Sequence, residues 1–395
     1  MTVSIAVLAR MYAHLPPKTT WPVAVAVLSI SPVSTLDAQN LTVESLTDYF
    51  SQANIVDGPT LVDCTLSAGT KSTCFQITVK NGPSSHALGP WCPETTTDTA
   101  EAGGIWLENG EVYNVDGAFI KNLSTFYEDE HWQLFDSSTG DINVTDTYEK
   151  CAGAAKPDVE PEFQQHCVQC LNDYMDDDAS VTYTIPMPPV VMDAPSPTTA
   201  AGSGVAFNGL RLDAPAPVSD ILGNYTLAPF DDCGGHINLH VGYHYHAATD
   251  CLEETAVATE HGRAIGLAMD GHWIMERESD DGSVPSDLDR CGGHVTNESG
   301  YHYHAGEPGS NAILGCLVAQ YGCVSEEPGS ECDASASRGG PGGSGGPDFA
   351  AAARTLGVSE SALMDALGGP PPDLDRAASQ LGLSVDELQK ALARH

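Results

Sequence analysis

The chain contains 395 residues, with 16 Lys and Arg against 54 Asp and Glu, so its formal net charge is −38 at pH 7. A surface this acidic repels phosphate backbones and anionic lipids, which excludes a nucleic-acid-binding protein, and it attracts cations. The hydrophobic content of 41% suffices for packed cores, and the length predicts two or three structural units.

Residues 1–38 have the features of a signal peptide. Arg10 and Lys18 precede a short apolar run at 21–30, and Ala38 is a small residue of the kind found at cleavage sites. The run is too short to span a bilayer, so we expect no membrane insertion of the mature chain. The chain also has 12 cysteines, an even set that suits disulfides outside the cytoplasm. We therefore predict an exported protein, periplasmic or extracellular.

Residues 39–185 are predicted to form an N-terminal β-rich region that contains cysteines. Short β-branched runs such as 73–80 alternate with turn residues, and the Asn109-Gly110 pair between two such runs is typical of a hairpin. Cys64 and Cys74 flank one turn and are candidates for a disulfide.

A Cys-x-x-Cys motif lies near the end of this region, at Cys167 and Cys170. A redox dithiol, half a zinc ribbon and a haem attachment site share this spacing, but Leu171 stands where haem attachment needs His. We favour structural disulfides with Cys92 and Cys151, because the chain has the features of an exported protein. The proline-rich residues 186–202 then predict an extended segment.

An internal duplication dominates the next region, 203–332. Asp-Cys-Gly-Gly-His at 232–236 is followed after six residues by Tyr-His-Tyr-His, and Arg-Cys-Gly-Gly-His at 290–294 is followed in the same way. Matched positions are 58 residues apart (291 − 233). A further cysteine follows each copy, which predicts one disulfide per copy. The disulfide candidates of this region are Cys233, Cys251, Cys291, Cys316, Cys323 and Cys332.

Each Tyr-His-Tyr-His is predicted to be a β-strand with both histidines on one face and both tyrosines on the other. The Gly-Gly-His turn adds a third imidazole to each copy. Three imidazoles are the ligand count of an open transition-metal site, and imidazole suits copper or zinc. The predicted metal ligands are His236, His244, His246, His294, His302 and His304.

Two arrangements of these ligands are open. Each copy holds its own ion, or the two copies combine in one six-histidine cluster, and we favour the shared cluster. The alternative to metal binding is a core in which the histidines are hydrogen-bonded across a sheet. Asp270, between the copies, is the candidate catalytic residue, as a general base or as a carboxylate that orients an imidazole. Asp232 and Asp289 are candidates for the same roles.

The duplicated motif resembles the YHYH-domain family. The resemblance covers about 203–320, including the segments 203–209 and 265–271, and extends more loosely upstream to 89–93. It departs from the family pattern at His272 and Trp273, where His272 adds a further candidate ligand. The resemblance implies an extracytoplasmic, β-rich domain and no particular reaction.

The C-terminal part of the chain has a different character. Residues 333–347 are a Gly/Ser/Pro linker by composition, and residues 348–395 are predicted to form a tandem helical-hairpin module. A pattern of Ala and Leu that begins at Ala352 recurs from Ala377, and Ser384 with Glu387 forms a capping-box sequence. This module is a candidate site for a protein partner.

Together these features predict a mainly β protein. Its core is a disulfide-stabilised, β-sandwich-like domain with an internal duplication, followed by a small all-α module. The predicted function is binding of a transition metal ion, copper or zinc, outside the cytoplasm. The alternatives are a secreted metalloenzyme, either a copper oxidoreductase or a zinc hydrolase, and a surface interaction protein with structural histidines.

Overall fold

The computed structural model describes residues 41–336, apart from 81, 83–85, 157–158, 177, 200, 240, 253–255, 260–261, 280, 298 and 327, together with 352, 356, 358, 360–367 and 374–392. The predicted signal peptide and most of the predicted linker lie outside the described residues. Among the residues that are described, no helix is both long and apolar enough to cross a membrane.

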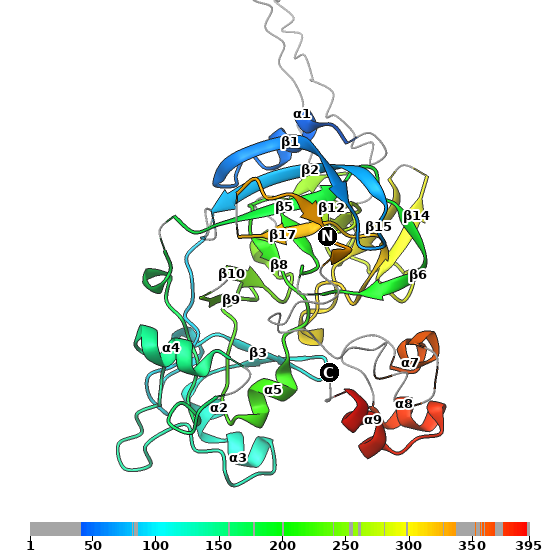
Figure 1. The fold of residues 1–395 in the computed structure, drawn as a ribbon. Helices are drawn as coiled ribbons and strands as arrows, with labels where there is room; N and C mark the ends of the chain where they lie inside the picture. Colours follow the sequence, from blue (N-terminus) through cyan, green and yellow to red (C-terminus); the bar gives the residue numbers. More distant parts are fainter. Residues whose placement is uncertain are drawn as a thin grey trace, which may run out of the picture. The chain divides into compact units, whose positions relative to one another are not determined.

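The protein is mainly β, and its first sheet has five strands in the order β17-β5-β2-β1-β18 (Figure 1). All neighbours are antiparallel except β18, which runs parallel to β1. The strands of the predicted N-terminal region and the last strands of the predicted duplicated region therefore share one sheet. Their bounds are β1 Ile55–Thr65, β2 Lys71–Lys80, β5 Ser180–Pro186, β17 Cys323–Ser325 and β18 Cys332–Asp333.

The second sheet has nine strands and contains the duplication. Eight of them follow the order β14-β15-β13-β12-β7-β8-β10-β9, and β11 pairs with β12 beside this path. The bounds are β7 Gly204–Ala206, β8 Arg211–Leu212, β9 Gly235–Asn238, β10 Gly242–Tyr245, β11 Val257–Ala258, β12 Arg263–Ala268, β13 Trp273–Met275, β14 Gly293–Thr296 and β15 Gly300–His304.

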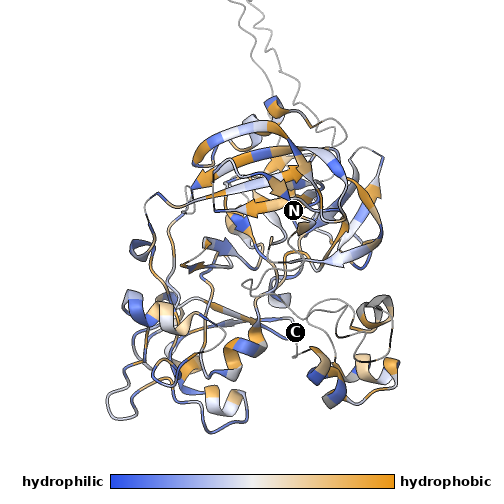
Figure 2. Ribbon diagram, in the orientation of Figure 1, coloured by the Kyte–Doolittle hydropathy of each residue, from blue (hydrophilic) through white to orange (hydrophobic). Residues whose placement is uncertain are grey.

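The two sheets share one hydrophobic core, which makes the domain sandwich-like. Hydrophobic and hydrophilic residues mix in short stretches along β1 and β2 (Figure 2), and β2 buries more of its residues than β1 does. Phe75 of β2 and Val205 of β7 belong to the same buried cluster. Phe50 joins the sheets, because its ring lies 5.8 Å from that of Phe75 and 5.3 Å from that of Phe207. Phe50 directly follows helix α1 (Val43–Tyr49).

A second buried cluster is formed by Trp106, Phe230 and their neighbours. It includes the hairpin of β3 (Ile105–Glu108) and β4 (Glu111–Asn114), whose turn is the predicted Asn109-Gly110. The short helices of this part of the chain are α2 Gly117–Lys121, α3 Leu123–Phe126, α4 Tyr148–Ala154 and α5 Val218–Gly223.

The proline-rich segment is extended, as predicted, and it is also paired. Strand β6 (Val191–Pro197) forms an antiparallel two-stranded sheet with β16 (Cys316–Ala319). In the C-terminal module, the described helices are α7 Glu360–Leu367, α8 Leu374–Leu381 and α9 Val385–Leu392. Their buried residues are Ala and Leu. The Ser384 amide donates to Glu387 Oε2 at 3.0 Å and the Glu387 amide donates to Ser384 Oγ at 3.2 Å, which forms the predicted capping box.

All twelve cysteines are paired in six disulfides. Both cysteines of the Cys-x-x-Cys motif are bonded to distant partners rather than to each other, which excludes a free dithiol there. Each copy of the duplicated motif has its own disulfide. The pairs are Cys64–Cys74, Cys92–Cys167, Cys151–Cys170, Cys233–Cys251, Cys291–Cys316 and Cys323–Cys332.

Candidate metal sites

The two copies of the motif form equivalent hairpins. In the first copy, β9 and β10 are antiparallel with His236 opposite His244, and in the second, β14 and β15 place His294 opposite His302. Each second strand also runs parallel to an inner strand, β10 beside β8 and β15 beside β13. The inner strands β7 and β12 pair with each other at the middle of the path. The sheet therefore repeats a four-strand unit about its centre.

In the first copy, His236, His244 and His246 form a compact group, which we call the first triad. Each residue contributes one ring nitrogen, and these nitrogens lie within 4.8 Å of one another. The ring centroids are 4.8 to 5.1 Å apart. Phe230 is fully buried and covers one side, because its centroid lies 4.8 Å from that of His236 and 5.1 Å from that of His246. An aromatic ring thus packs on one side of the first triad, in which His236 remains partly exposed.

In the second copy, His294, His302 and His304 form the second triad, with the same limit of 4.8 Å between ring nitrogens. The Nε2 atoms of His294 and His302 are only 3.0 Å apart. The expected shared cluster of six histidines is wrong, because the structure gathers them in two groups. The two hairpins lie at opposite ends of the strand order, five strand steps and roughly 24 Å apart along the sheet (Figure 1).

Backbone carbonyls orient most of the imidazoles. In the first triad, His244 Nδ1 bonds the carbonyl of Gly242 at 2.9 Å and His246 Nδ1 bonds that of Ala214 at 2.8 Å. The ring of His236 bonds the carbonyl of Pro229.

The second triad repeats this arrangement with one change. His302 Nδ1 bonds the carbonyl of Gly300 at 3.1 Å, and His304 Nδ1 bonds that of Glu276 at 2.7 Å. His294 Nδ1 instead bonds a carboxylate, Asp287 Oδ1, at 2.9 Å.

These partners determine the tautomers. A carbonyl or an ionised carboxylate only accepts hydrogen bonds, so an Nδ1 atom bound to one must carry the proton. In a neutral ring Nε2 then has a lone pair. The Nε2 atoms of His294 and His302 lie 3.0 Å apart, so in neutral rings their lone pairs would face each other. This contact is favourable only when a cation or an additional proton lies between the two rings.

Burial keeps the first triad neutral. It holds the pKa values of His236 and His246 well below the usual value of 6.5, and the neighbouring imidazoles lower them further. Burial also lowers the pKa of His244, although the carboxylate of Asp213 opposes this change. Neutral imidazole is the form that binds metal ions, so these rings are in the ligand state at pH 7.

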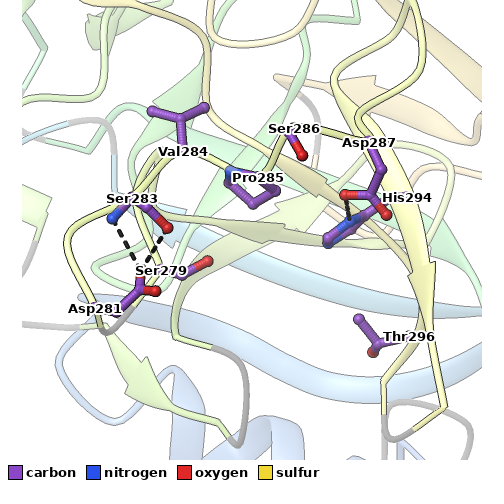
Figure 3. A pocket seen from close by; sticks show the side chains of 9 residues that line it. All are labelled: Ser279, Asp281, Ser283, Val284, Pro285, Ser286, Asp287, His294 and Thr296. Atoms are coloured by element: carbon purple, nitrogen blue, oxygen red, sulfur yellow. Dashed lines mark hydrogen bonds and ion pairs between the residues drawn. The ribbon is translucent and has the colours of Figure 1, made fainter.

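The surroundings of the second triad are more open. A cleft of about 490 Å³ borders it and is lined mainly by hydroxyl and carboxylate side chains, with His294 at one wall. Figure 3 shows the carboxylate of Asp287 next to the imidazole of His294, with the hydrogen bond between them, in the lining of this cleft. The side chain of Asp287 is 70% exposed, whereas that of His294 is only 6% exposed. The cleft therefore gives solvent access to the carboxylate that orients one ring of the second triad.

The tyrosines occupy the opposite faces of the two strands and donate to carboxylates, of which Asp231 is buried and Asp289 is exposed. Tyr243 donates its hydroxyl to Asp231 Oδ1, and Tyr301 donates to Asp289 Oδ2, each at 2.9 Å. Burial raises the pKa of Asp231 to about 6. Asp231, which the sequence analysis did not select, makes the bonds in the first copy that Asp289 makes in the second. The 58-residue offset between 231 and 289 is the sequence signal that identifies it.

Asp270, the candidate catalytic residue, has the contacts of a structural acid. It is fully buried and its Oδ2 accepts from the Tyr303 hydroxyl at 2.6 Å and from the Ala319 amide at 3.0 Å. Its Oδ1 accepts from the His272 amide at 3.2 Å. Neither Asp270 nor His272 belongs to a triad. The ring of His272 packs on that of Tyr301, with centroids 5.0 Å apart, and its Nδ1 lies 3.2 Å from Asp270 Oδ1.

The Gly-Gly-His turn is needed because the chain passes directly over a tyrosine. A Cβ atom at Gly235 would overlap the hydroxyl of Tyr243, and one at Gly293 would overlap that of Tyr301. The motif thus combines a glycine that allows close contact, a tyrosine below it and a histidine after it. This combination holds the third imidazole against the strand that carries the other two.

Comparison with known proteins gives one match. Residues 182–287 match a family model described as YHYH protein. The matched segment runs from β5 through the first triad and ends before the second Tyr-His-Tyr-His. No curated protein and no solved structure matches the chain.

Proposed function

We propose that this protein, which carries a domain of the YHYH family, binds two transition metal ions, one in each histidine triad. The ligands are the Nε2 atoms of the first triad and of the second triad. The ions are copper or zinc, for which imidazole is a preferred ligand. The protein acts outside the cytoplasm, in metal binding or metal handling.

The orientation of the imidazoles is the observation that carries this proposal. A histidine that ligates a metal almost always donates its other ring N–H to a carbonyl or a carboxylate, which fixes the tautomer and the direction of the ring. Five of the six rings have an Nδ1 bond of this kind, and the sixth, His236, bonds a carbonyl. In the second triad the Nε2 atoms of His294 and His302 face each other at 3.0 Å, which histidines that only filled a core would have no reason to do.

The chemistry of the donors supports copper or zinc over calcium or magnesium. Calcium and magnesium take cages of oxygen ligands, whereas each triad offers three imidazole nitrogens. Three protein nitrogens form an incomplete tetrahedron, so a further ligand completes each site. Export is supported by the six disulfides, which persist in oxidising compartments.

Metal analysis of the full-length protein tests the proposal. The protein is stripped with a chelator, incubated with Zn²⁺ or Cu²⁺, desalted and analysed for metal per chain. We expect about two ions per chain for the wild type and about none for a variant with His244→Gln, His246→Gln, His302→Gln and His304→Gln, because each triad then keeps only one ring. The control is His131→Gln, which removes a ring that is 79% exposed and leaves both triads unchanged. Equal metal content in all three proteins would contradict the proposal.

A second candidate function is metal-dependent catalysis at the second triad. The specific observation in its favour is the polar cleft, which has His294 in its lining and so brings small polar molecules next to one ring of this triad. Adding azide to the Co²⁺-loaded protein tests this access. A change in the visible spectrum that persists when the first triad is removed would support an open coordination position, and an unchanged spectrum would count against catalysis there.

A further inference from the structure

A carboxylate lies beside the first triad on the imidazole face of the sheet. Strand β8 runs parallel to β10, with Arg211 opposite His244 and Leu212 opposite Tyr245. Because side chains alternate along a strand, Arg211 and Asp213 share a face with the histidines, and Leu212 shares one with the tyrosines. Asp213 therefore follows β8 at the level of the first triad.

The contacts of Asp213 fix one of its oxygens and direct the other at the imidazoles. Oδ1 bonds Arg211 Nη2 at 3.0 Å and accepts from the Ala214 amide at 2.7 Å. Oδ2 lies 3.8 Å from Nε2 of His244, the nitrogen proposed as a ligand. The side chain of Asp213 is 16% exposed and that of Arg211 is 6% exposed. A buried guanidinium thus holds the carboxylate in place and balances its charge.

From this placement we propose that Asp213 is the fourth ligand of the metal ion in the first triad. Two ligand atoms that are each about 2.1 Å from a tetrahedral ion lie about 3.4 Å from each other. Oδ2 must therefore approach Nε2 of His244 by about 0.4 Å, and it must also move toward the other two rings, because Asp213 lies outside the group of ligand atoms within 4.8 Å of one another. The inference rests on the proposed function, and it closes the first site with three nitrogens and one oxygen.

Among the residues that the structure describes, none provides a carboxylate to the second triad at the position of Asp213. In the second copy Ile274 lies opposite Tyr303 and Met275 opposite His304, so Met275 occupies the position of Asp213. The next residue supports this alignment of Met275 with Asp213. His304 bonds the carbonyl of Glu276, which follows Met275, as His246 bonds the carbonyl of Ala214, which follows Asp213. The two sites are therefore unequal: the first is complete within the protein, and the second keeps a position for an outside ligand.

Cobalt spectroscopy on the full-length protein tests the role of Asp213. His294→Gln and His304→Gln remove the second triad, so that Co²⁺ reports on the first site alone. Adding Asp213→Asn should then weaken Co²⁺ binding at least about tenfold and change the visible absorption, because one ligand is lost. The matched control is Asp287→Asn in the same background, which alters a carboxylate next to the second triad only and should leave both readouts unchanged.

A ligand exchange at the same position gives a positive signal even if Asp213→Asn destabilises the fold. Asp213→Cys places a thiolate there, and a thiolate bound to Co²⁺ absorbs strongly in the near ultraviolet. Bound Co²⁺ without this band, or Asp213→Asn with unchanged affinity and spectrum, would show that Asp213 only pairs with Arg211. Failure of the background protein itself to bind Co²⁺ would instead overturn the proposed function.

Discussion

The first and second triads are built from the same motif but differ in what surrounds them. The first is covered by Phe230 and lies beside the Asp213–Arg211 ion pair. The second borders a cleft, and an exposed carboxylate, Asp287, orients its His294. The hairpin and its disulfide thus reproduce the same imidazole geometry twice. Neighbouring strands and loops decide the charge and the solvent access of each site.

The largest expected effect concerns the independence of the two triads. His244→Gln with His246→Gln should reduce the metal content from about two ions per chain to about one, because the second triad lies at the other end of the sheet. His302→Gln with His304→Gln should give the same stoichiometry. Metal analysis after desalting measures both. Loss of both ions from either variant would show that the two sites are coupled and would contradict their independence.

Removing the ring that covers the first triad should have the next largest effect. Phe230 is fully buried and packs on His236, His246 and Trp106. Phe230→Ala should lower the free energy of unfolding by about 3–5 kcal/mol, because it leaves a cavity. Urea unfolding of the metal-free protein measures this loss. Zn²⁺ release to a chelator should also become faster from the first triad alone. Equal acceleration at the second triad would show that the effect of Phe230 is not confined to the first.

Asp287 should matter for the second triad only. Asp287→Asn replaces a carboxylate that accepts from His294 with a weaker, neutral acceptor, so the affinity of the second site should fall by about 10- to 100-fold. Competition with a chelating dye resolves the two affinities in one titration. An unchanged second site would mean that Asp287 does not orient the ligand, and a weakened first site would mean that the effect is general.

The smallest expected effect is a pH dependence of the metal-free protein. Burial holds the pKa values of His236 and His246 well below 6.5, so these rings stay neutral in the folded protein while the unfolded chain binds protons. The free energy of unfolding should therefore have its full value above about pH 6.5, and it should decrease as the pH falls below 6.5. Urea unfolding at a series of pH values measures this slope. His236→Gln with His246→Gln should flatten it, and a steeper slope in that variant would contradict the assignment.

The sequence predicted the local parts of the fold well. The hairpin at Asn109-Gly110, the capping box at Ser384 and the mainly β character follow from residues that are close in the chain. The gathering of three imidazoles in each copy is also local, since a turn of six residues connects the ligands. Copper or zinc binding remains a proposal that this geometry supports.

The sequence was less informative about long-range neighbours. It suggested one shared cluster, and it did not select Asp231, which bonds Tyr243 as Asp289 bonds Tyr301. It gave no reason to select Asp213 or Asp287. These acids lie next to the triads only because particular strands and loops pack there.

By itself the sequence determined the motif, its duplication and the faces of the strands, because the alternation of side chains along a strand and the length of a hairpin are fixed by covalent geometry. Tertiary structure alone decided that β7 and β12 pair at the middle of the sheet and that the triads stand apart at its ends. Pairing between distant strands depends on the packing of the whole core, which local residue patterns do not specify.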